Sequence, residues 1–174
     1  MKTIGQSAKS LLIVIILLLV QINGMQAQKK WKDYLVSGSA MFVSGMLDGT
    51  IESISYHYEN GFKQRLPNAN DQFWNPAVSW KNKYYQNNPQ MGPKFLGSTT
   101  IFACTTDAYH LLRTTKRSID GANLVYYMNK ECKSNKTFQK RWKSEVKDFL
   151  ILTAIRCAGF HLTYSVLFRP QAGK

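Results

Sequence analysis

Hydrophobic and polar positions follow a helical period in three stretches of the chain, the first of them residues 32–58. Apolar side chains recur there every three or four positions from Leu35 to Tyr58, while Ser44 and Asp48 fall on the other side. This spacing predicts an amphipathic helix. Glycine weakens a helix by up to about 1 kcal/mol per residue. We therefore expect the glycines to admit a neighbouring backbone, at positions 38, 45 and 49.

A second helix is predicted over residues 98–116, where the period returns. Ser98 or Thr99 is a suitable N-cap, and the last turn is basic, as the helix dipole favours. Asp120-Gly121 is then typical of a turn. The short apolar run 124–128 fits either a strand or a turn of helix.

The third predicted helix, residues 136–168, is basic in its first half and apolar in its second. The apolar half carries one stripe that we expect to be buried, made of Leu150, Ile151, Ala154, Ile155, Ala158, Leu162 and Val166. Residues 148–168 are long enough to cross a membrane, but Arg156 near their middle would cost about 2.5–3.5 kcal/mol in hydrocarbon. A buried core helix is therefore favoured, and a membrane span is the alternative.

Residues 59–97, between the first two helices, have no sustained helical period and are rich in proline, asparagine and aromatic residues. Pairs such as Asn75-Pro76 are typical of turns. Disordered segments are poor in aromatic residues, so we expect an ordered loop that packs across the helices. The predicted fold class is mostly α, with three principal helices packed in one bundle-like domain and a long, aromatic, irregular loop.

The first 27 residues have the pattern of a secretory signal. Lys2 and Lys9 precede an unbroken apolar run from Leu11 to Val20, and small and polar residues follow up to Ala27. This order predicts a signal peptide cleaved after Ala27, because a small residue must precede the cut. The alternative is an uncleaved N-terminal anchor. Residues 28–174 would then be a single helical domain, exported to the periplasm or cell envelope and in contact with the membrane there.

The chain is strongly basic, with 23 Lys and Arg against 10 Asp and Glu and a net charge of +13. Outside the cytoplasm this charge favours a membrane surface, an anionic envelope polymer or another envelope protein as partner. Export removes the usual nucleic-acid target, so we expect no nucleic-acid partner. A solvated basic surface without a ligand is the alternative. The basic residues expected to make the contact are Lys136, Lys140, Arg141, Lys143 and Lys147.

The aromatic loop is the second candidate binding element. Trp74 and Trp80 stand beside amide and basic residues, a combination that suits a membrane–water interface or stacking on sugar rings. The alternative is that these rings cover the helices as part of the core.

Catalytic or metal chemistry would have to rest on the histidines. Asp107 precedes His110 by three positions, so their side chains share a helix face. With His161 they form a candidate acid–base set, and with His57 as well a candidate metal set for a hydrolase. The favoured interpretation is structural: Asp107 orients His110 in a buried network, and Arg156 neutralises an acid of the first helix, Asp48 or Glu52. No cofactor motif is present, so the cofactor is unknown.

The three cysteines, Cys104, Cys132 and Cys157, are weak evidence for a disulfide bond. Their odd number leaves at least one free or paired with another molecule. A Cys104–Cys157 bridge is possible in an oxidising compartment. Otherwise both thiols lie in apolar stretches, where cysteine is usually a small buried hydrophobic residue.

Four short motifs lie within residues 35–115: FWNP at 73–76, SWKNKY at 79–84, GSTT at 97–100 and TDAYH at 106–110. Together with Asp48-Gly49 and the Ala27-Gln28 end of the signal, they resemble an uncharacterised family of small envelope or membrane proteins from Bacteroidota-type bacteria. The resemblance implies an envelope location and membrane association. The family has no known activity, so the resemblance assigns no catalytic residue. The function predicted is a non-catalytic envelope protein, with the hydrolase centred on Asp107 and His110 as the alternative.

Overall fold

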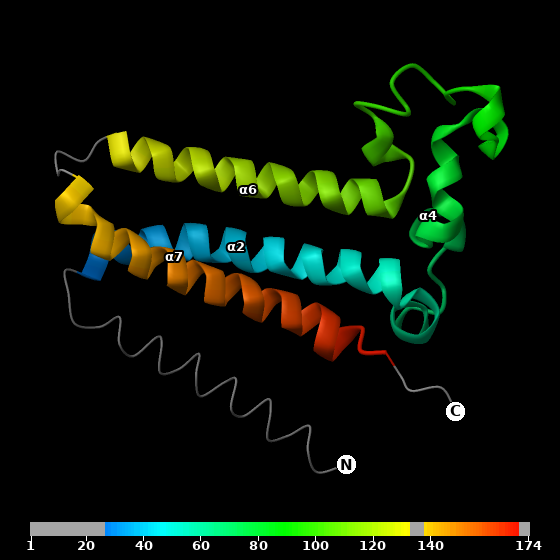
Figure 1. Cartoon of the computed structure of the whole chain (residues 1–174). Helices are drawn as coiled ribbons and strands as arrows, with labels where there is room; N and C mark the ends of the chain where they lie inside the picture. Colours follow the sequence, from blue (N-terminus) through cyan, green and yellow to red (C-terminus); the bar gives the residue numbers. More distant parts are fainter. Residues whose placement is uncertain (1–26, 133–137, 171–174) are drawn as a thin grey trace, which may run out of the picture. The chain divides into compact units, whose positions relative to one another are not determined.

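The computed structural model of the protein describes residues 27–132 and 138–170, with the side chains of residues 31–129 and 142–170. The chain divides into two compact units, residues 1–36 and 37–174, and the second holds the elements discussed here. Its long helices are α2 (Ala27–Tyr56), which begins in the first unit, α6 (Ala108–Cys132) and α7 (Phe138–His161), which continues as a π-helical turn over Leu162–Leu167 (Figure 1). The mostly α fold with three principal helices is confirmed.

The segment between α2 and α6 is a chain of short helical turns rather than an irregular loop. Asn70, Asn75 and Asn88 act as N-caps there, and each side chain accepts a hydrogen bond of 3.0 Å from a backbone N–H two positions on. The asparagine-rich turns predicted from the sequence are thus present. The turns are the π-helical Tyr58–Phe62, α3 (Lys63–Arg65), α4 (Asp71–Trp74), α5 (Pro76–Ser79), and the 3₁₀ turns Trp80–Lys83, Tyr85–Asn87, Pro89–Met91 and Ala103–Thr105.

The second long helix begins and ends later than the sequence predicted. It runs from residue 108 to 132 instead of 98 to 116, and its first turn is capped by Asp107, not by Ser98 or Thr99. Asp120-Gly121 lies inside the helix and not in a turn, and residues 124–128 are helical. A helix tolerates an open glycine at a modest energetic cost, so the Asp-Gly pair did not mark an end.

A small aromatic core lies where α2 ends. The Phe62 ring is 4.9 Å from Phe168 and 5.2 Å from Trp74, measured between ring centroids. Ile54 and Tyr58 complete the buried cluster. Trp74 is half-buried and packs against this core, as the alternative for the aromatic loop proposed, and the core joins the short turns to Phe168, after the last turn of α7.

The α2–α7 contact is built from small residues. A Cβ atom at Gly45 would clash with the backbone carbonyl of Arg156, and one at Gly159 would clash with that of Phe42. Thr163 Oγ1 donates a 3.0 Å hydrogen bond to the Met46 carbonyl across the same contact. The expectation that glycines of the first helix admit a neighbouring backbone is confirmed at Gly45 and at Gly49, where a Cβ atom would clash with the Phe160 carbonyl.

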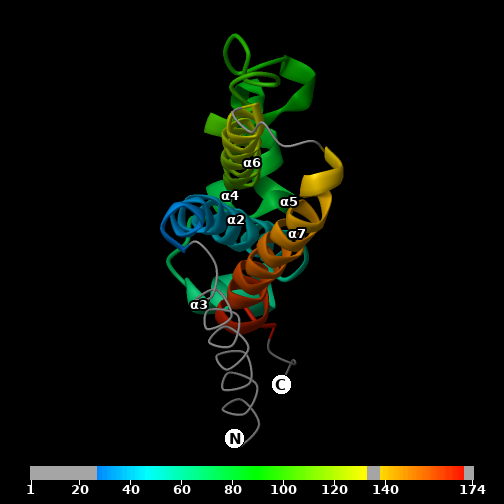
Figure 2. The same ribbon diagram turned by 90° about the vertical axis from the view of Figure 1, so that its left-hand side faces the viewer.

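The apolar stripe of α7 is not buried, contrary to the prediction of a core helix. Only 17% of its apolar window within Trp142–Leu167 is buried. None of the seven residues predicted to form the buried stripe is fully buried: three are exposed, Leu150, Ala154 and Val166, and the other four are half-buried. The buried positions of α7 and its following turn are instead Leu152, Gly159 and Thr163. Small side chains let the helices approach so closely that the larger apolar groups remain on the outside. Figure 2 shows α7 beside α2 and α6 with its other side uncovered by other described elements.

Candidate functional site

Five side chains join α2, α6 and α7 in one polar network. The two carboxylate oxygens of Asp48 each lie 2.8 Å from a cation, one from Lys116 Nζ and the other from the Arg156 guanidinium. Arg156 is also 3.7 Å from Asp120 Oδ1, and that oxygen accepts a 2.6 Å hydrogen bond from Ser44 Oγ. Each helix thus contributes at least one charged group.

The network confirms the expected partner of Arg156, which is Asp48 and not Glu52. Burial by itself would raise the pKa of Asp48, but the hydrogen bonds from Lys116 and Arg156 outweigh it and hold that pKa below its ordinary value. The carboxylate is therefore charged at neutral pH. A permanently charged, paired acid is suited to holding helices together and unsuited to accepting a proton in catalysis.

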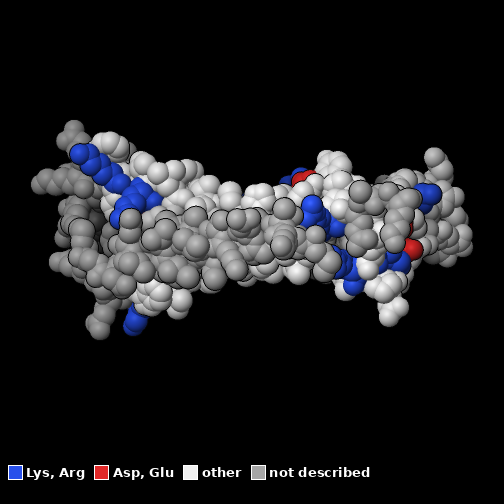
Figure 3. Space-filling model, turned by 90° about the horizontal axis from the view of Figure 1, so that it is seen from below, with Lys and Arg blue, Asp and Glu red and all other residues white. Residues whose placement is uncertain are grey.

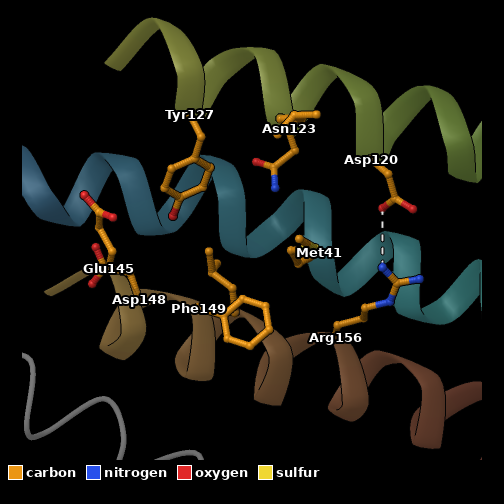
Figure 4. Close-up of a pocket in the computed structure, with 10 residues that line it drawn as sticks. Met41, Asp120, Asn123, Tyr127, Glu145, Asp148, Phe149 and Arg156 are labelled. Atoms are coloured by element: carbon orange, nitrogen blue, oxygen red, sulfur yellow. Dashed lines mark ion pairs between the residues drawn. The ribbon is translucent and has the colours of Figure 1, made fainter. Parts of the chain in front are cut away.

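A cavity of about 500 Å³ lies between the three helices beside this network. Its walls are mainly apolar, formed by Met41 of α2, Leu124 of α6, and Phe149 and Leu152 of α7. In Figure 4 the Arg156–Asp120 ion pair closes one end of the cavity. A volume of this size accommodates a small organic molecule.

The polar side chains of the cavity are mostly hydrogen-bond acceptors. Glu145 and Asp148 of α7 line the end away from the ion pair, beside Tyr127, and Asn123 points into the space between (Figure 4). Asn123 is only 6% exposed, and its Oδ1 has no hydrogen-bond partner in the described part of the chain. A buried acceptor without a donor is costly, so this atom is a place where a ligand would gain a hydrogen bond.

The predicted pair Asp107 and His110 is in contact. Asp107 is 1% exposed, and its Oδ1 accepts 2.9 Å hydrogen bonds from both the backbone N–H and the Nδ1 of His110. Its Oδ2 lies 3.0 Å from Thr106 Oγ1, which donates to it. These contacts satisfy a helix N-terminus, and they support the structural interpretation of the pair.

The other two histidines have partners of their own. His57 Nε2 lies 2.9 Å from the Tyr164 hydroxyl, and His161 Nδ1 lies 3.1 Å from Ser165 Oγ. Among the residues whose placement is described, no group of three or more His, Cys, Asp or Glu side chains could hold a metal ion. The structure therefore does not bring His57, Asp107, His110 and His161 together as the metal alternative required.

The candidate basic and aromatic contacts are only partly described. Lys143 is exposed, with its Nζ 5.8 Å from the Trp142 ring centroid, and Trp80 is exposed beside Lys81 at 5.7 Å. Lys136 lies outside the described residues, as do the side chains of Lys140 and Arg141. In Figure 3 the visible Lys and Arg side chains lie toward the two ends of the view, and few Asp or Glu side chains are visible.

Two described cysteines differ from expectation. Cys104 and Cys157 are both free thiols, so they form no bridge with each other. Cys157 is exposed on α7 instead of buried, and the exposed residues Leu150 and Ala154 precede it on the same side of the helix. Cys132 lies where side chains are not described.

The cavity residues were missed by the sequence interpretation, although a signal existed. On α6, Asp120, Asn123 and Tyr127 stand three and then four positions apart, the spacing of one helical face. Assigning a turn to Asp120-Gly121 broke that face in two. On α7, Glu145 and Asp148 were placed in a basic half and not considered.

Comparison with protein-family models, with curated proteins and with solved structures finds no match for this chain.

Proposed function

We propose that this is a non-catalytic envelope protein that binds the membrane surface through the outer face of α7. The observation that carries the proposal is the long apolar helix Trp142–Leu167, with a mean hydropathy of 1.4 in its most apolar window, of which only 17% is buried. Large side chains such as Val146 and Leu150 stand exposed along it. A soluble monomer rarely exposes so extended an apolar face, whereas a helix in contact with lipid does.

The exposed arginines of α6 favour a bundle that lies on the membrane over one that crosses it. Lys116 and Arg156 meet at Asp48, so α6 and α7 are side by side at this level. α6 exposes Arg113 and Arg117 there. An arginine in hydrocarbon costs about 2.5–3.5 kcal/mol, so the outer face of α6 belongs in water while that of α7 enters the lipid.

Basic residues at the start of α7 would add attraction to anionic headgroups. Lys143 and Lys147 are exposed, and Lys136, Lys140 and Arg141 precede them in the sequence. Each lysine or arginine near an anionic surface contributes about 1 kcal/mol at moderate ionic strength. Trp142 and Lys143 together form the aromatic and basic flank typical of a membrane interface.

Fluorophores at two positions test this orientation. One environment-sensitive label is placed on Cys157 after replacing the other two cysteines by serine. The matched control carries the label on Ser118→Cys, on the exposed side of α6, with all three native cysteines replaced. With anionic liposomes, the Cys157 label should shift to shorter wavelength and be quenched by lipids brominated near the headgroup, while the Ser118 label stays in water.

Two results would contradict the proposal. A Cys157 label that does not respond to liposomes would remove the membrane contact. Equal responses from both labels, with strongest quenching by lipids brominated deep in the acyl chains, would indicate a bundle surrounded by lipid instead of one lying on it. Using the label position as the readout keeps binding through the N-terminal segment from being mistaken for binding through α7.

The exported location is part of the same proposal and has its own measurement. N-terminal sequencing of the mature protein should begin at or near Gln28, after the signal pattern of residues 1–27. The hydrolase alternative gains no support from the Asp107–His110 pair, because the oxygens of Asp107 are engaged in capping α6.

A further inference from the structure

We propose that the cavity between α2, α6 and α7 binds a neutral aliphatic alcohol, with its chain against the apolar walls and its hydroxyl at Asn123. The proposal is separate from membrane contact, because the cavity is lined by residues of the three helices themselves. Two independent features support it, which are an apolar cavity that opens to the surface and a buried amide whose oxygen has no partner.

The first feature is the size and lining of the cavity. Met41, Leu124, Phe149 and Leu152 make its walls mainly apolar, and its volume is about 500 Å³. An apolar cavity of about 150 Å³ is enough for benzene, so a chain of about eight carbons has ample room. Leu124 and Phe149 line the cavity although they are 61% and 68% exposed. The cavity therefore has an apolar mouth between α6 and α7, through which a chain can enter.

The charged side chains of the lining already have partners. Arg156 pairs with Asp48 at 2.8 Å and lies 3.7 Å from Asp120. Glu145 and Asp148 also have interactions of their own. An ionised ligand would therefore give up its hydration to apolar walls without meeting a free counter-charge. A neutral molecule loses less hydration when it enters the cavity, so the lining favours a neutral ligand.

The second feature is the side-chain amide of Asn123, which points into the cavity (Figure 4). The residue is 6% exposed, and its Oδ1 has no hydrogen-bond partner in the described part of the chain. A half-turn of the amide exchanges its oxygen and its NH₂ group, so either can face a ligand. A hydroxyl both donates and accepts, so it suits the amide in both orientations. An ether oxygen only accepts, so it cannot supply the donor that Oδ1 lacks.

The test compares two isomers, 1-octanol and 1-methoxyheptane, by NMR titration of the full chain in the absence of lipid. The isomers have the same atoms and nearly the same length, but only octanol has an O–H donor. We expect octanol to bind about fivefold more tightly, which is the usual net effect of one hydrogen bond. Octanoate and octylammonium, both ionised at neutral pH, should bind more weakly than octanol because of their hydration.

A further probe, 1-monooctanoylglycerol, distinguishes two sources of such a hydroxyl. It carries a chain of the same length on the neutral, hydroxyl-bearing head of a lipid. Binding as tight as that of octanol would indicate a neutral lipid as the natural source. Binding of octanol without the glyceride would indicate a free alcohol.

Two substitutions locate the binding, and a third is their control. Asn123→Leu removes the amide at nearly constant volume, so it should reduce the octanol-to-methoxyheptane affinity ratio from about five to about one. Leu124→Trp adds bulk at the mouth and should weaken octanol binding about fivefold or more. Val125→Trp adds the same bulk at the next position, which is exposed and outside the lining, and should leave octanol binding unchanged.

The proposal is overturned if methoxyheptane or an ionised probe binds the wild type as tightly as octanol, or if octanol does not bind. A preference for octanol that persists in Asn123→Leu overturns it as well, because the hydroxyl would then lie elsewhere. Equal octanol binding by Leu124→Trp and Val125→Trp has the same consequence. Far-ultraviolet circular dichroism checks the folding of each variant, and both tryptophan substitutions are at positions more than half exposed.

Discussion

At the scale of single residues, Asp107 shows how one side chain can resemble a catalytic group while serving a helix. Its position three residues before His110, next to apolar neighbours, indicated an acid–base pair. In the structure its carboxylate accepts from the backbone N–H and ring of His110 and from the Thr106 hydroxyl, while it is almost fully buried. Of those donors, the His110 backbone N–H would otherwise be left without a partner at the start of α6.

Substitutions at Asp107 should therefore act on stability in a graded way. Asp107→Ala removes the cap and should lower the free energy of unfolding by about 1–2 kcal/mol. Asp107→Asn keeps an oxygen in the same place and should cost less than about 1 kcal/mol, since asparagine caps helices as well as aspartate does. Chemical denaturation measures both. Equal losses for the two variants would show that charge, and not capping, is what the site requires.

His110→Ala separates the two roles considered for the pair. Asp107 retains the His110 backbone N–H and Thr106 as donors in this variant, so the change should cost less stability than Asp107→Ala. If the variant were as stable as the wild type and yet lost its cellular function, the acid–base alternative would regain support.

At the scale of elements, the α2–α7 contact depends on glycines that leave no room for a side chain. A Cβ atom at Gly159 would clash with the Phe42 carbonyl and crowd the Met46 nitrogen, both of them backbone atoms that cannot move alone. By contrast, Gly121 in α6 has nothing within 4 Å of the same position. The two glycines therefore make a matched pair for mutation.

Gly159→Ala should destabilise the protein by about 1–3 kcal/mol, because it overpacks a close helix contact. Gly121→Ala should stabilise it by about 0.5–1 kcal/mol, because alanine is the better helix former where space is free. Thermal unfolding of both variants against the wild type measures the difference. Stabilisation by both substitutions would mean that the two helices do not pack as closely as described.

The sequence predicted which elements form better than it predicted which face of each helix is buried and where each helix begins and ends. A period of three to four residues predicted three long helices, although the second lies later in the chain than expected, and asparagines predicted turns that they do cap. The same period indicates which residues share a helix face, but it does not indicate whether that face is buried. On α7 the glycine and threonine at positions 159 and 163 occupy the interface, so the larger apolar residues, such as Leu150, were wrongly expected to be buried. The cavity could not be predicted from the sequence, because its lining combines residues of different helices, such as Asn123 of α6 and Glu145 of α7.

At the scale of the whole helical unit, ion pairs help to hold the helices together, a role that a large apolar core has in other small proteins. The buried aromatic cluster lies at the end of α2, whereas Asp48, Lys116 and Arg156 join the three long helices farther along. This division leaves apolar side chains of α7 exposed on the outside and a cavity between the three helices. The stability of the unit should accordingly depend on the charge of the Asp48 carboxylate.

The pH dependence of unfolding tests that dependence. The pKa of Asp48 is held below its ordinary value by Lys116 and Arg156 in the folded protein. An unfolded aspartate titrates near pH 4, so protons bind the unfolded chain more tightly. The contribution of Asp48 is therefore complete above about pH 4 and is lost as the pH falls through the lower pKa of the folded state.

Asp48→Asn should lower the free energy of unfolding by about 1–2 kcal/mol at pH 7, an estimate reduced because the pair is partly exposed. The difference between wild type and variant should shrink steadily below about pH 4. The pKa of Asp71 is also lowered, by its hydrogen bonds with Lys63 and Tyr58. Its contribution to the free energy of unfolding is therefore lost over the same acidic range in both proteins. Subtracting one unfolding curve from the other removes that shared effect and leaves the contribution of Asp48. A difference that stayed constant down to pH 2 would show that Asp48 contributes through its shape alone, and that its ion pairs do not hold the three helices together.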